Sequence, residues 1–507
     1  MSLPLSFTRV CAAGFTLLLA AATLAAAAEP TAQIAVTLPR SGPGPYSGRV
    51  IVTFEPAAEG AEDPWWQEGA AGFEVSGIPG GATVTFPADA SKYPADLSAL
   101  PPGRYVARAM LDVMHRVAYS GEPYGGFISS PQQIVVKAGT SLDLHFALDR
   151  AVAERTDPDT KSVRHVSFVS PALSGFWQRP IAMHAVVLLP PDYARQPERR
   201  FPTIFTIDGF GADAHVGMRQ LARWQKALAA NGAQLIVVFL DPSFPSGHHV
   251  FADSANNGPW GRALTAEFIP ELEREFRMSA TPRTRLLNGH SSGGWSSLWL
   301  QITYPEVFGG TWSSSPDPVD FHDFTGPDLT HVPANVYHDA AGREFPLVRD
   351  PAGKDVMTVR QYVEHEEAEG PTGGQWSSFD AVFSPRRPDG TPAPLFDRAS
   401  GAVDPVVAAY WEAHYDIAAL LRARWPELGP QLRGKLNIFV GTQDTYHLEG
   451  AVYRLRDELR DLGSDAQITI VPGADHGTIF RWKGGLIEEI VRQMLASLPP
   501  EFRTSGA

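Results

Sequence analysis

From about residue 165 to residue 500, segments with the pattern of buried strands alternate with segments with the pattern of amphipathic helices. The strand patterns include AVVLLPP, FPTIFTIDG, AQLIVVFLDP, TRLLNG, KLNIFVGTQD and AQITIVPG. The helical patterns lie at 216–230, 260–276, 293–304, 447–462 and 486–498. This alternation predicts an α/β domain with a mostly parallel sheet and helices on both of its faces. In such a sheet the functional loops follow the carboxyl ends of the strands.

Residues 30–152 have a different pattern, with short strands of period two separated by Gly and Pro turns. They predict an N-terminal antiparallel β-sandwich of the immunoglobulin-like kind. Its role has two interpretations. Trp65, Trp66, Tyr105 and Tyr124 could stack on sugars, which would make it a carbohydrate-binding module. The interpretation that we favour is a packing module whose aromatic residues fill its core and its contact with the next domain.

A segment at about 318–430 interrupts the alternation within the second domain. It is rich in Pro, Gly, Asp and Trp, and it is too long for an ordinary connection between two strands of one sheet. We therefore expect an insertion that lies over the functional face as a cap and shapes substrate access.

The amino terminus has the layout of a secretory signal peptide. Residues 1–28 contain Arg9, then an Ala- and Leu-rich run, then small residues before Glu29. We expect cleavage after Ala28 and export to the periplasm or the medium, with no stable membrane insertion. The single cysteine, Cys11, lies in this segment, so the mature chain has no disulfide. The formal charge of −14 makes nucleic acid an unsuitable partner.

The stretch LLNGHSSGGWSS contains the pattern G-x-S-x-G at residues 289–293. An apolar strand pattern precedes it and a helical pattern follows it. Glycines on both sides of Ser291 permit a tight strand-to-helix turn that exposes the serine hydroxyl above the sheet. Ser291 is therefore the candidate nucleophile.

Two further residues supply the other groups that an activated serine requires. Asp444 follows the strand pattern KLNIFVG, and His476 follows AQITIVPG, so both lie at predicted carboxyl ends of strands. An imidazole must take the serine proton, and a carboxylate must orient that imidazole. We expect His476 to be the base and Asp444 its partner, with Glu449 as an alternative acid. Asp475 is less suitable because it adjoins His476 in sequence.

Acyl transfer also requires donors for the negatively charged oxygen of the transition state. We expect the backbone N–H groups of Ser292 and Phe210, the latter in the glycine-containing loop after FPTIFTI, to form this oxyanion hole. Trp260, Trp295 and Trp376 are candidate substrate-pocket residues, with the hydrophobic core as the alternative location.

Two groups of potential metal ligands have no recognised ligand spacing. One comprises His248, His249 and Asp253, and the other comprises Asp317, Asp320, His322 and Asp323. We therefore predict neither a metal nor an organic cofactor.

From about Arg179 to Phe480 the chain resembles the esterase D-like branch of the α/β-hydrolases, the putative esterase family that includes feruloyl esterases, enterochelin esterases and mycolyltransferases. The matching pieces are FPTIFTIDGFG, FADSANNGPWGRALTAEFIPELEREFR, LLNGHSSGGWSSLWLQITYPEVFGGTWSSSP, GTQD and DHG. The resemblance implies an α/β-hydrolase fold. Many members have His-Gly at the oxyanion loop where this chain has Asp208-Gly209, so no side-chain role carries over there.

These observations together predict an exported serine hydrolase that cleaves carboxylic esters of small molecules or glycans through an acyl-enzyme. An acyltransferase and a peptidase would use the same three residues. A non-catalytic protein that binds glycan or envelope components on a hydrolase fold is the alternative from another class, although a decayed site would be expected to lack at least one of the three. The sequence contains no indication of the oligomeric state.

Overall fold

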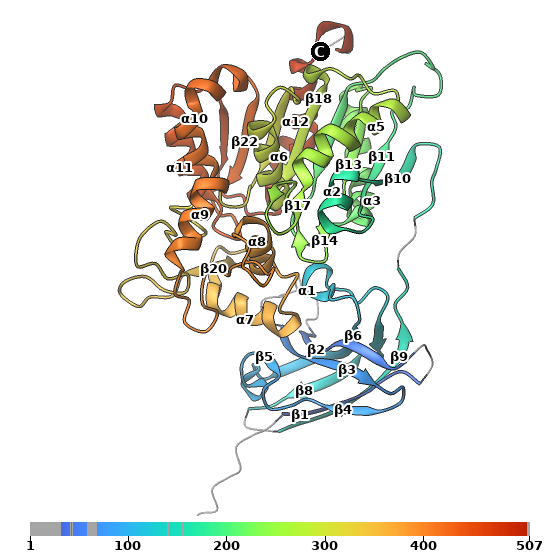
Figure 1. The fold of residues 1–507 in the computed structure, drawn as a ribbon, viewed down its shortest axis with the longest axis vertical. Helices are drawn as coiled ribbons and strands as arrows, with labels where there is room; N and C mark the ends of the chain where they lie inside the picture. Colours follow the sequence, from blue (N-terminus) through green and yellow to red (C-terminus); the bar gives the residue numbers. More distant parts are fainter. Residues whose placement is uncertain are drawn as a thin grey trace, which may run out of the picture.

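The computed structural model describes residues 32–40, 42, 44–57, 68–138, 141–154 and 157–503. The predicted signal peptide, Cys11, Trp65 and Trp66 lie outside the described residues. Two large sheets dominate the fold, one formed by the N-terminal part of the chain and one by the rest (Figure 1). Among the described residues, no helix combines the length and the apolar character needed to cross a membrane.

The N-terminal part forms a curled sheet of nine described strands with the order β4-β1-β9-β7-β6-β2-β3-β5, and β8 pairs with β6. The strands are β1 (Ala32–Thr37), β2 (Tyr46–Pro56), β3 (Gly69–Ile78), β4 (Thr83–Thr85), β5 (Ser91–Tyr93), β6 (Gly103–Asp112), β7 (Phe127–Ser129), β8 (Gln132–Val136) and β9 (Leu142–Ala151). All pairs are antiparallel except β1 with β9. Every second residue of β9 is buried from Leu142 to Leu148, so period two does mark the inward face. The predicted fold class is confirmed, and one continuous sheet curls to enclose the core.

The second sheet has eight strands in the order β10-β11-β13-β12-β18-β19-β22-β23. They are β10 (Val163–Val169), β11 (Ala182–Leu188), β12 (Thr203–Ile207), β13 (Ile236–Leu240), β18 (Arg285–His290), β19 (Gly310–Ser314), β22 (Leu436–Gly441) and β23 (Gln467–Val471). The strands from β13 to β23 pair in parallel, and β10 and β11 form an antiparallel edge. The predicted mostly parallel sheet is confirmed.

Helices cover both faces of this sheet. Trp224 of α3 (Ala214–Ala230) and Met494 of α12 (Leu486–Ser497) belong to the hydrophobic core on one face. On the other face Leu272 of α5 and Leu300 of α6 pack against inward side chains of β12 and β13. The remaining short elements are α2 (Pro171–Trp177), β14 (Ser243–Phe244), β15 (Gly247–His248), β16 (Asp253–Ser254), β17 (Gly258–Pro259), α4 (Trp260–Ala263), α5 (Ile269–Glu275), α6 (Ser292–Thr303) and α11 (Glu449–Asp461).

The segment between β19 and β22 forms a subdomain with its own aromatic core. It contains β20 (Pro346–Arg349), β21 (Asp355–Thr358), α7 (Val359–Glu369), α8 (Gln375–Phe383), α9 (Pro405–Tyr415) and α10 (Ile417–Leu432). Phe321, Trp376 and Trp411 are buried in this core, which continues onto Trp295 and Trp299 of α6. In Figure 1 its α7, α8 and β20 lie toward the N-terminal sheet, whereas α10 lies beside α11 and β22 of the second sheet.

The N-terminal sheet contacts the subdomain closely. The guanidinium group of the buried Arg49, on β2, donates hydrogen bonds to the carbonyl oxygens of Glu367 (2.8 Å) and Ala368 (3.2 Å) at the end of α7. A Cβ atom at Gly72 of β3 would lie 2.2 Å from the Ala368 oxygen, so glycine is needed for this approach. Hydrogen bonds from a charged group to helix C-terminal carbonyls are among the stronger ones in proteins. The sheet and the end of α7 are thus in direct contact.

Candidate active site

Ser291 occupies the turn between β18 and α6. Its backbone has φ 58° and ψ −126°, a conformation that a non-glycine residue adopts only where its surroundings enforce it. A Cβ atom at Gly289 would lie 1.9 Å from the Gly293 oxygen, and a Cβ atom at Gly293 would lie 1.9 Å from the Ile207 oxygen. The Ser291 N–H donates to the Ser314 oxygen of β19 at 3.0 Å. The expected strand-to-helix turn is present, and close backbone contacts explain its glycines.

Asp444 and His476 form a hydrogen-bonded pair. Asp444 lies in the loop after β22 and His476 in the loop after β23. The Nδ1 atom of His476 is 3.0 Å from Asp444 Oδ2 and 3.2 Å from Oδ1. The Asp444 side chain is fully buried, and its Oδ1 also accepts the Tyr446 N–H at 3.0 Å. The two loops follow neighbouring parallel strands, so they meet at the same edge of the sheet.

The charges of this pair stabilise each other. Burial alone would raise the pKa of Asp444, but the charge of His476 and the hydrogen bonds from its ring and from the Tyr446 N–H outweigh burial and lower the pKa. Burial alone would lower the pKa of His476, but the charge and hydrogen bond of Asp444 raise that pKa above 6.5. An imidazole held in this way is a stronger proton acceptor than a free one.

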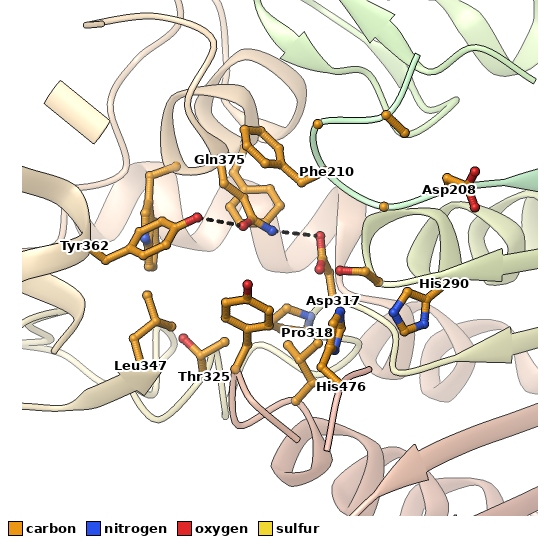
Figure 2. Close-up of a pocket in the computed structure, with 18 of the residues that line it drawn as sticks. Asp208, Phe210, His290, Asp317, Pro318, Thr325, Leu347, Tyr362, Gln375 and His476 are labelled. Atoms are coloured by element: carbon orange, nitrogen blue, oxygen red, sulfur yellow. Dashed lines mark hydrogen bonds between the residues drawn. The ribbon is translucent and has the colours of Figure 1, made fainter. Parts of the chain in front are cut away.

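Ser291 and His476 line a cavity of about 350 Å³. Its walls come from the loop after β12, from α3, from the subdomain and from the loops after β22 and β23, as Figure 2 shows for part of the lining. The lining residues are Asp208, Gly209, Phe210, Gly211, Ala212, Arg219, Gln220, His290, Ser291, Asp317, Pro318, Phe324, Thr325, Leu347, Tyr362, Gln375, Trp376, Phe379, Tyr446, Leu448, His476 and Phe480. Aromatic side chains with a few polar groups between them are typical of a small-molecule site.

A second carboxylate, that of Asp317, faces this cavity although only 4 % of the residue is exposed. Asp317 Oδ2 accepts the Ser292 hydroxyl at 2.6 Å and the Gln375 amide at 3.5 Å. The Tyr362 hydroxyl donates to Gln375 Oε1 at 3.3 Å, and Figure 2 shows the resulting row of side chains across the cavity. Burial raises the pKa of Asp317 to about 6, although the Ser292 hydrogen bond and the charge of His476 act against it.

The loop that is expected to hold one oxyanion donor adjoins Ser291. Residues 209–212 form a turn in which the Ala212 N–H donates to the Gly209 oxygen at 3.1 Å. A Cβ atom at Gly209 would lie 2.8 Å from the Ser291 Cβ atom. The loop therefore brings Phe210, the predicted donor, to the wall of the cavity next to Ser291, while Ser292 begins α6.

The three tryptophans suggested for the pocket have different locations. Trp376 lines the cavity. Trp260 is buried in the core under β12 and β13, where it stacks on His249 at a ring distance of 3.7 Å. Trp295 is buried against the subdomain and stacks on Trp299 at 5.0 Å. Trp260 and Trp295 thus belong to the core, the alternative location for these side chains.

The alternative acids are occupied by other interactions. Glu449 Oε1 accepts a hydrogen bond from Arg349 at 2.6 Å. Asp475 Oδ1 accepts the N–H groups of Gly477 (2.9 Å) and Thr478 (2.6 Å), which closes its own loop. Neither carboxylate has a hydrogen bond to His476 among the described residues, so Asp444 is its partner in this structure.

The possible metal ligands have different surroundings. His248 is buried and its Nε2 atom lies 3.1 Å from the Asp208 oxygen. Asp320, His322 and Asp416 do bring one ligand atom each within 4.8 Å of the others. However, Asp416 accepts the N–H groups of Phe321 and Ala419, and Asp320 accepts that of His322. These carboxylates complete turns and a helix N-terminus, which is the common role of Asp at such positions.

Some residues of the cavity were not predicted as site residues from the sequence. In the sequence Asp317 was considered only as a possible metal ligand. Tyr362 and Gln375 lie in a segment without a recognisable motif. His290, inside the G-x-S-x-G pattern, packs its ring 4.4 Å from the ring of His476, and burial lowers its pKa well below the ordinary value. A neutral His290 therefore adds no positive charge beside His476.

The sheet order, the turn at Ser291 and the cavity at the carboxyl ends of the strands define an α/β-hydrolase. Residues 180–389 match the family described as putative esterase, so the predicted resemblance is confirmed over this part of the chain. No curated protein is significantly similar in sequence.

Several solved structures are similar to this chain at low identity. A ferulic acid esterase has 12 % identity and a TM-score of 0.39, with 65 % of this chain and 98 % of that chain covered. The S-formylglutathione hydrolase from Staphylococcus aureus has 15 % identity and a TM-score of 0.40, with 66 % and 98 % covered. Carboxyl esterase 2 from the fungus Tuber melanosporum has 15 % identity and a TM-score of 0.40, with 67 % and 89 % covered.

Proposed function

We propose that this protein hydrolyses carboxylic esters with Ser291 as nucleophile, His476 as general base and Asp444 as the residue that orients His476. The observation that carries the proposal is the 3.0 Å contact of the buried Asp444 carboxylate with His476 Nδ1, at a cavity that Ser291 also lines. Because Asp444 occupies Nδ1, the Nε2 atom is left to take the serine proton.

Acylation follows from this arrangement. Ser291 Oγ bonds to the ester carbonyl carbon while its proton passes to His476 Nε2, and the carbonyl electron pair moves onto the oxygen. The N–H groups of Ser292 and Phe210 are proposed to stabilise that oxyanion, helped by the N-terminus of α6. Collapse of the intermediate breaks the bond to the alcohol oxygen, which leaves with the proton from His476.

Deacylation uses the same groups with water as the nucleophile. His476 takes a proton from the water as its oxygen bonds to the acyl carbon, then returns it to Ser291 Oγ as the acid leaves. An acyltransferase would admit a sugar or another alcohol at this step. The substrate is proposed to be a small-molecule or glycan-linked ester, since a cavity of about 350 Å³ holds an acyl group of modest size.

A fluorophosphonate tests whether Ser291 is activated. We expect the purified protein to gain one phosphonyl adduct on Ser291, because the reagent is attacked by serines whose proton is removed by a base. Intact-mass measurement and peptide sequencing locate the adduct, and Ser291→Ala is the control without the hydroxyl. A folded protein that remains unlabelled, or that is labelled elsewhere, would refute the proposed triad.

The pH dependence of kcat/KM tests the pair formed by His476 and Asp444. Only neutral His476 accepts a proton, so activity should rise with pH through a midpoint above 6.5, since Asp444 raises this pKa. In Asp444→Asn the imidazolium loses its partner, so the midpoint should move down and kcat should fall about ten-thousand-fold. An unchanged midpoint in Asp444→Asn would contradict the assignment of Asp444.

We also propose that the protein is exported and that residues 1–28 are removed. The support is the charged start, the apolar run and the small residues before Glu29. Expression of the full chain in a bacterial host, followed by cell fractionation and N-terminal sequencing, should recover protein that begins at Glu29 outside the cytoplasm. Recovery only of cytoplasmic protein that starts at Met1 would contradict export.

A further inference from the structure

Asp208 and Asp317 line the cavity with carboxylates that the proposed triad does not use, and the charges of Arg223 and Arg219 act on that of Asp208. Among the described residues, the hydrogen bonds to the Asp317 side chain, from Ser292 and Gln375, both go to Oδ2. Oδ1 has no such partner, yet it is not one of the described polar atoms that are sealed from solvent without a hydrogen bond. Since Asp317 lines the cavity, this second oxygen is the acceptor that a bound molecule can reach.

The position of Asp317 fixes which part of a substrate would meet it. Its backbone N–H donates to the backbone carbonyl oxygen of Ser291 at 3.2 Å. The Asp317 side chain therefore begins next to the nucleophile. Phe324, Trp376 and Phe379 also line the cavity. A polar group close to the reacting carbonyl would therefore meet Asp317, and an apolar remainder would lie against the aromatic rings.

An ionised carboxylate in a water-poor cavity is costly unless donors surround it. We propose that Asp317 binds a hydrogen-bond donor, a hydroxyl or an ammonium group, that the acyl part of the substrate carries next to its carbonyl carbon. The proposal rests on the proposed hydrolase function, because it assumes an ester carbonyl at Ser291. It assigns the site to 2-hydroxyacyl or 2-aminoacyl esters in preference to plain acyl esters.

Three ethyl esters that differ at one position test this assignment. The esters of 3-phenylpropanoic acid, 3-phenyllactic acid and phenylalanine carry hydrogen, hydroxyl and ammonium at C2. At pH 8, where the Asp317 carboxyl is ionised, we expect kcat/KM to be about tenfold or more higher for the hydroxyl or the ammonium ester than for the plain ester. The ester that is preferred identifies which donor the site takes.

Asp317→Asn is the matched variant, because it keeps the size and removes the charge. The ratio of kcat/KM for the preferred ester to kcat/KM for the plain ester should fall at least severalfold in this variant. Both values come from the same variant, so general losses of activity cancel. Asp320→Asn changes a neighbouring buried carboxylate outside the cavity lining and should keep the wild-type ratio.

Equal rates on the three esters, or a ratio unchanged in Asp317→Asn, would overturn the subsite. If wild type cleaves none of the esters and Ser291 takes no fluorophosphonate, the hydrolase function itself fails, whereas labelled Ser291 without preference refutes only the subsite.

The N-terminal part of the chain contacts the loop at residues 209–212 through the short helix α1 (Val117–Ser120). The buried hydroxyl of Tyr119 donates a hydrogen bond to the Ala212 oxygen, and its ring meets the Phe210 ring edge-to-face at 5.1 Å. Gly211, at φ 80°, lies so close to α1 that a Cβ atom there would be 3.1 Å from the backbone carbonyl oxygen of Tyr119. Tyr119 thus touches consecutive residues of the loop.

On its other side the loop contacts the nucleophile, because Gly209 lies directly against Ser291. The loop is therefore held between Ser291 and Tyr119, and its glycines would leave it mobile if either support were removed. Oxyanion donors act only when they are fixed within a fraction of an ångström of the developing charge. We infer that Tyr119 is a positioning residue that holds the Phe210 N–H in place. Burial raises the pKa of Tyr119 well above its ordinary value, so the hydroxyl stays a donor throughout the working pH range.

Tyr119→Phe removes this hydroxyl and little else, and Tyr337→Phe is its matched control. The Tyr337 hydroxyl also donates to a carbonyl oxygen, that of Arg398 at 2.6 Å, but Tyr337 does not line the cavity. We expect kcat to fall about tenfold in Tyr119→Phe with KM little changed, because a displaced donor weakens binding of the transition state. A trifluoromethyl ketone, which forms a tetrahedral adduct with the serine, should lose affinity by a similar factor.

Active-site titration with the fluorophosphonate separates positioning from general destabilisation. Turnover per labelled site should fall in Tyr119→Phe and remain at the wild-type value in Tyr337→Phe. A loss of titratable sites with unchanged turnover per site would show that Tyr119 serves stability only. Unchanged ketone affinity in Tyr119→Phe would likewise overturn the inference.

Discussion

The crowding of backbone around Ser291 is the constraint on which the active site depends. The carbonyl oxygens of Gly293 and Ile207 occupy the space that side chains at Gly289 and Gly293 would fill, at 1.9 Å in both cases. The chain is thereby forced from strand to helix within one residue, at a positive φ that serine does not favour. Strain of this kind persists because strands on both sides of β18 hold the turn in place. The same crowding brings the loop after β12 beside the serine.

Two buried carboxylates near the serine differ because their surroundings differ. Asp444 has a protonatable partner in His476, which lowers the pKa of the carboxyl despite complete burial. Asp317 has only neutral donors, Ser292 and Gln375, on one of its oxygens, and its pKa rises to about 6. The charge of Asp444 is satisfied within the protein, whereas Asp317 retains an acceptor that faces the cavity. This difference supports the two proposed roles, with Asp444 orienting the base and Asp317 selecting the substrate.

The sequence predicted the elements that depend on local pattern and left out those that depend on distant contacts. The strand and helix periods predicted the parallel sheet, and G-x-S-x-G with its flanking patterns predicted the turn at Ser291. The meeting of Asp444 and His476 followed from their positions after two adjacent strands. By contrast, the contact of Tyr119 with Ala212 joins residues 93 positions apart, one in α1 and the other in the loop after β12. Trp295 and Trp260 could not be assigned to pocket or core because a buried aromatic residue has the same local pattern in both.

The contacts of the N-terminal sheet change the interpretation of what this sheet does. Tyr105, which the sequence offered as a sugar-stacking residue, is buried in the core of the sheet and donates its hydroxyl to the Pro101 oxygen. The exposed surface that a carbohydrate module would need is therefore not supplied by this ring. Arg49 and Tyr119 instead reach the end of α7 and the loop after β12, two parts of the chain that also frame the cavity. Tyr362 of α7 and Phe210 of the loop after β12 both line the cavity. The N-terminal sheet contacts both elements, and so it can fix the width of the cavity from outside the catalytic sheet.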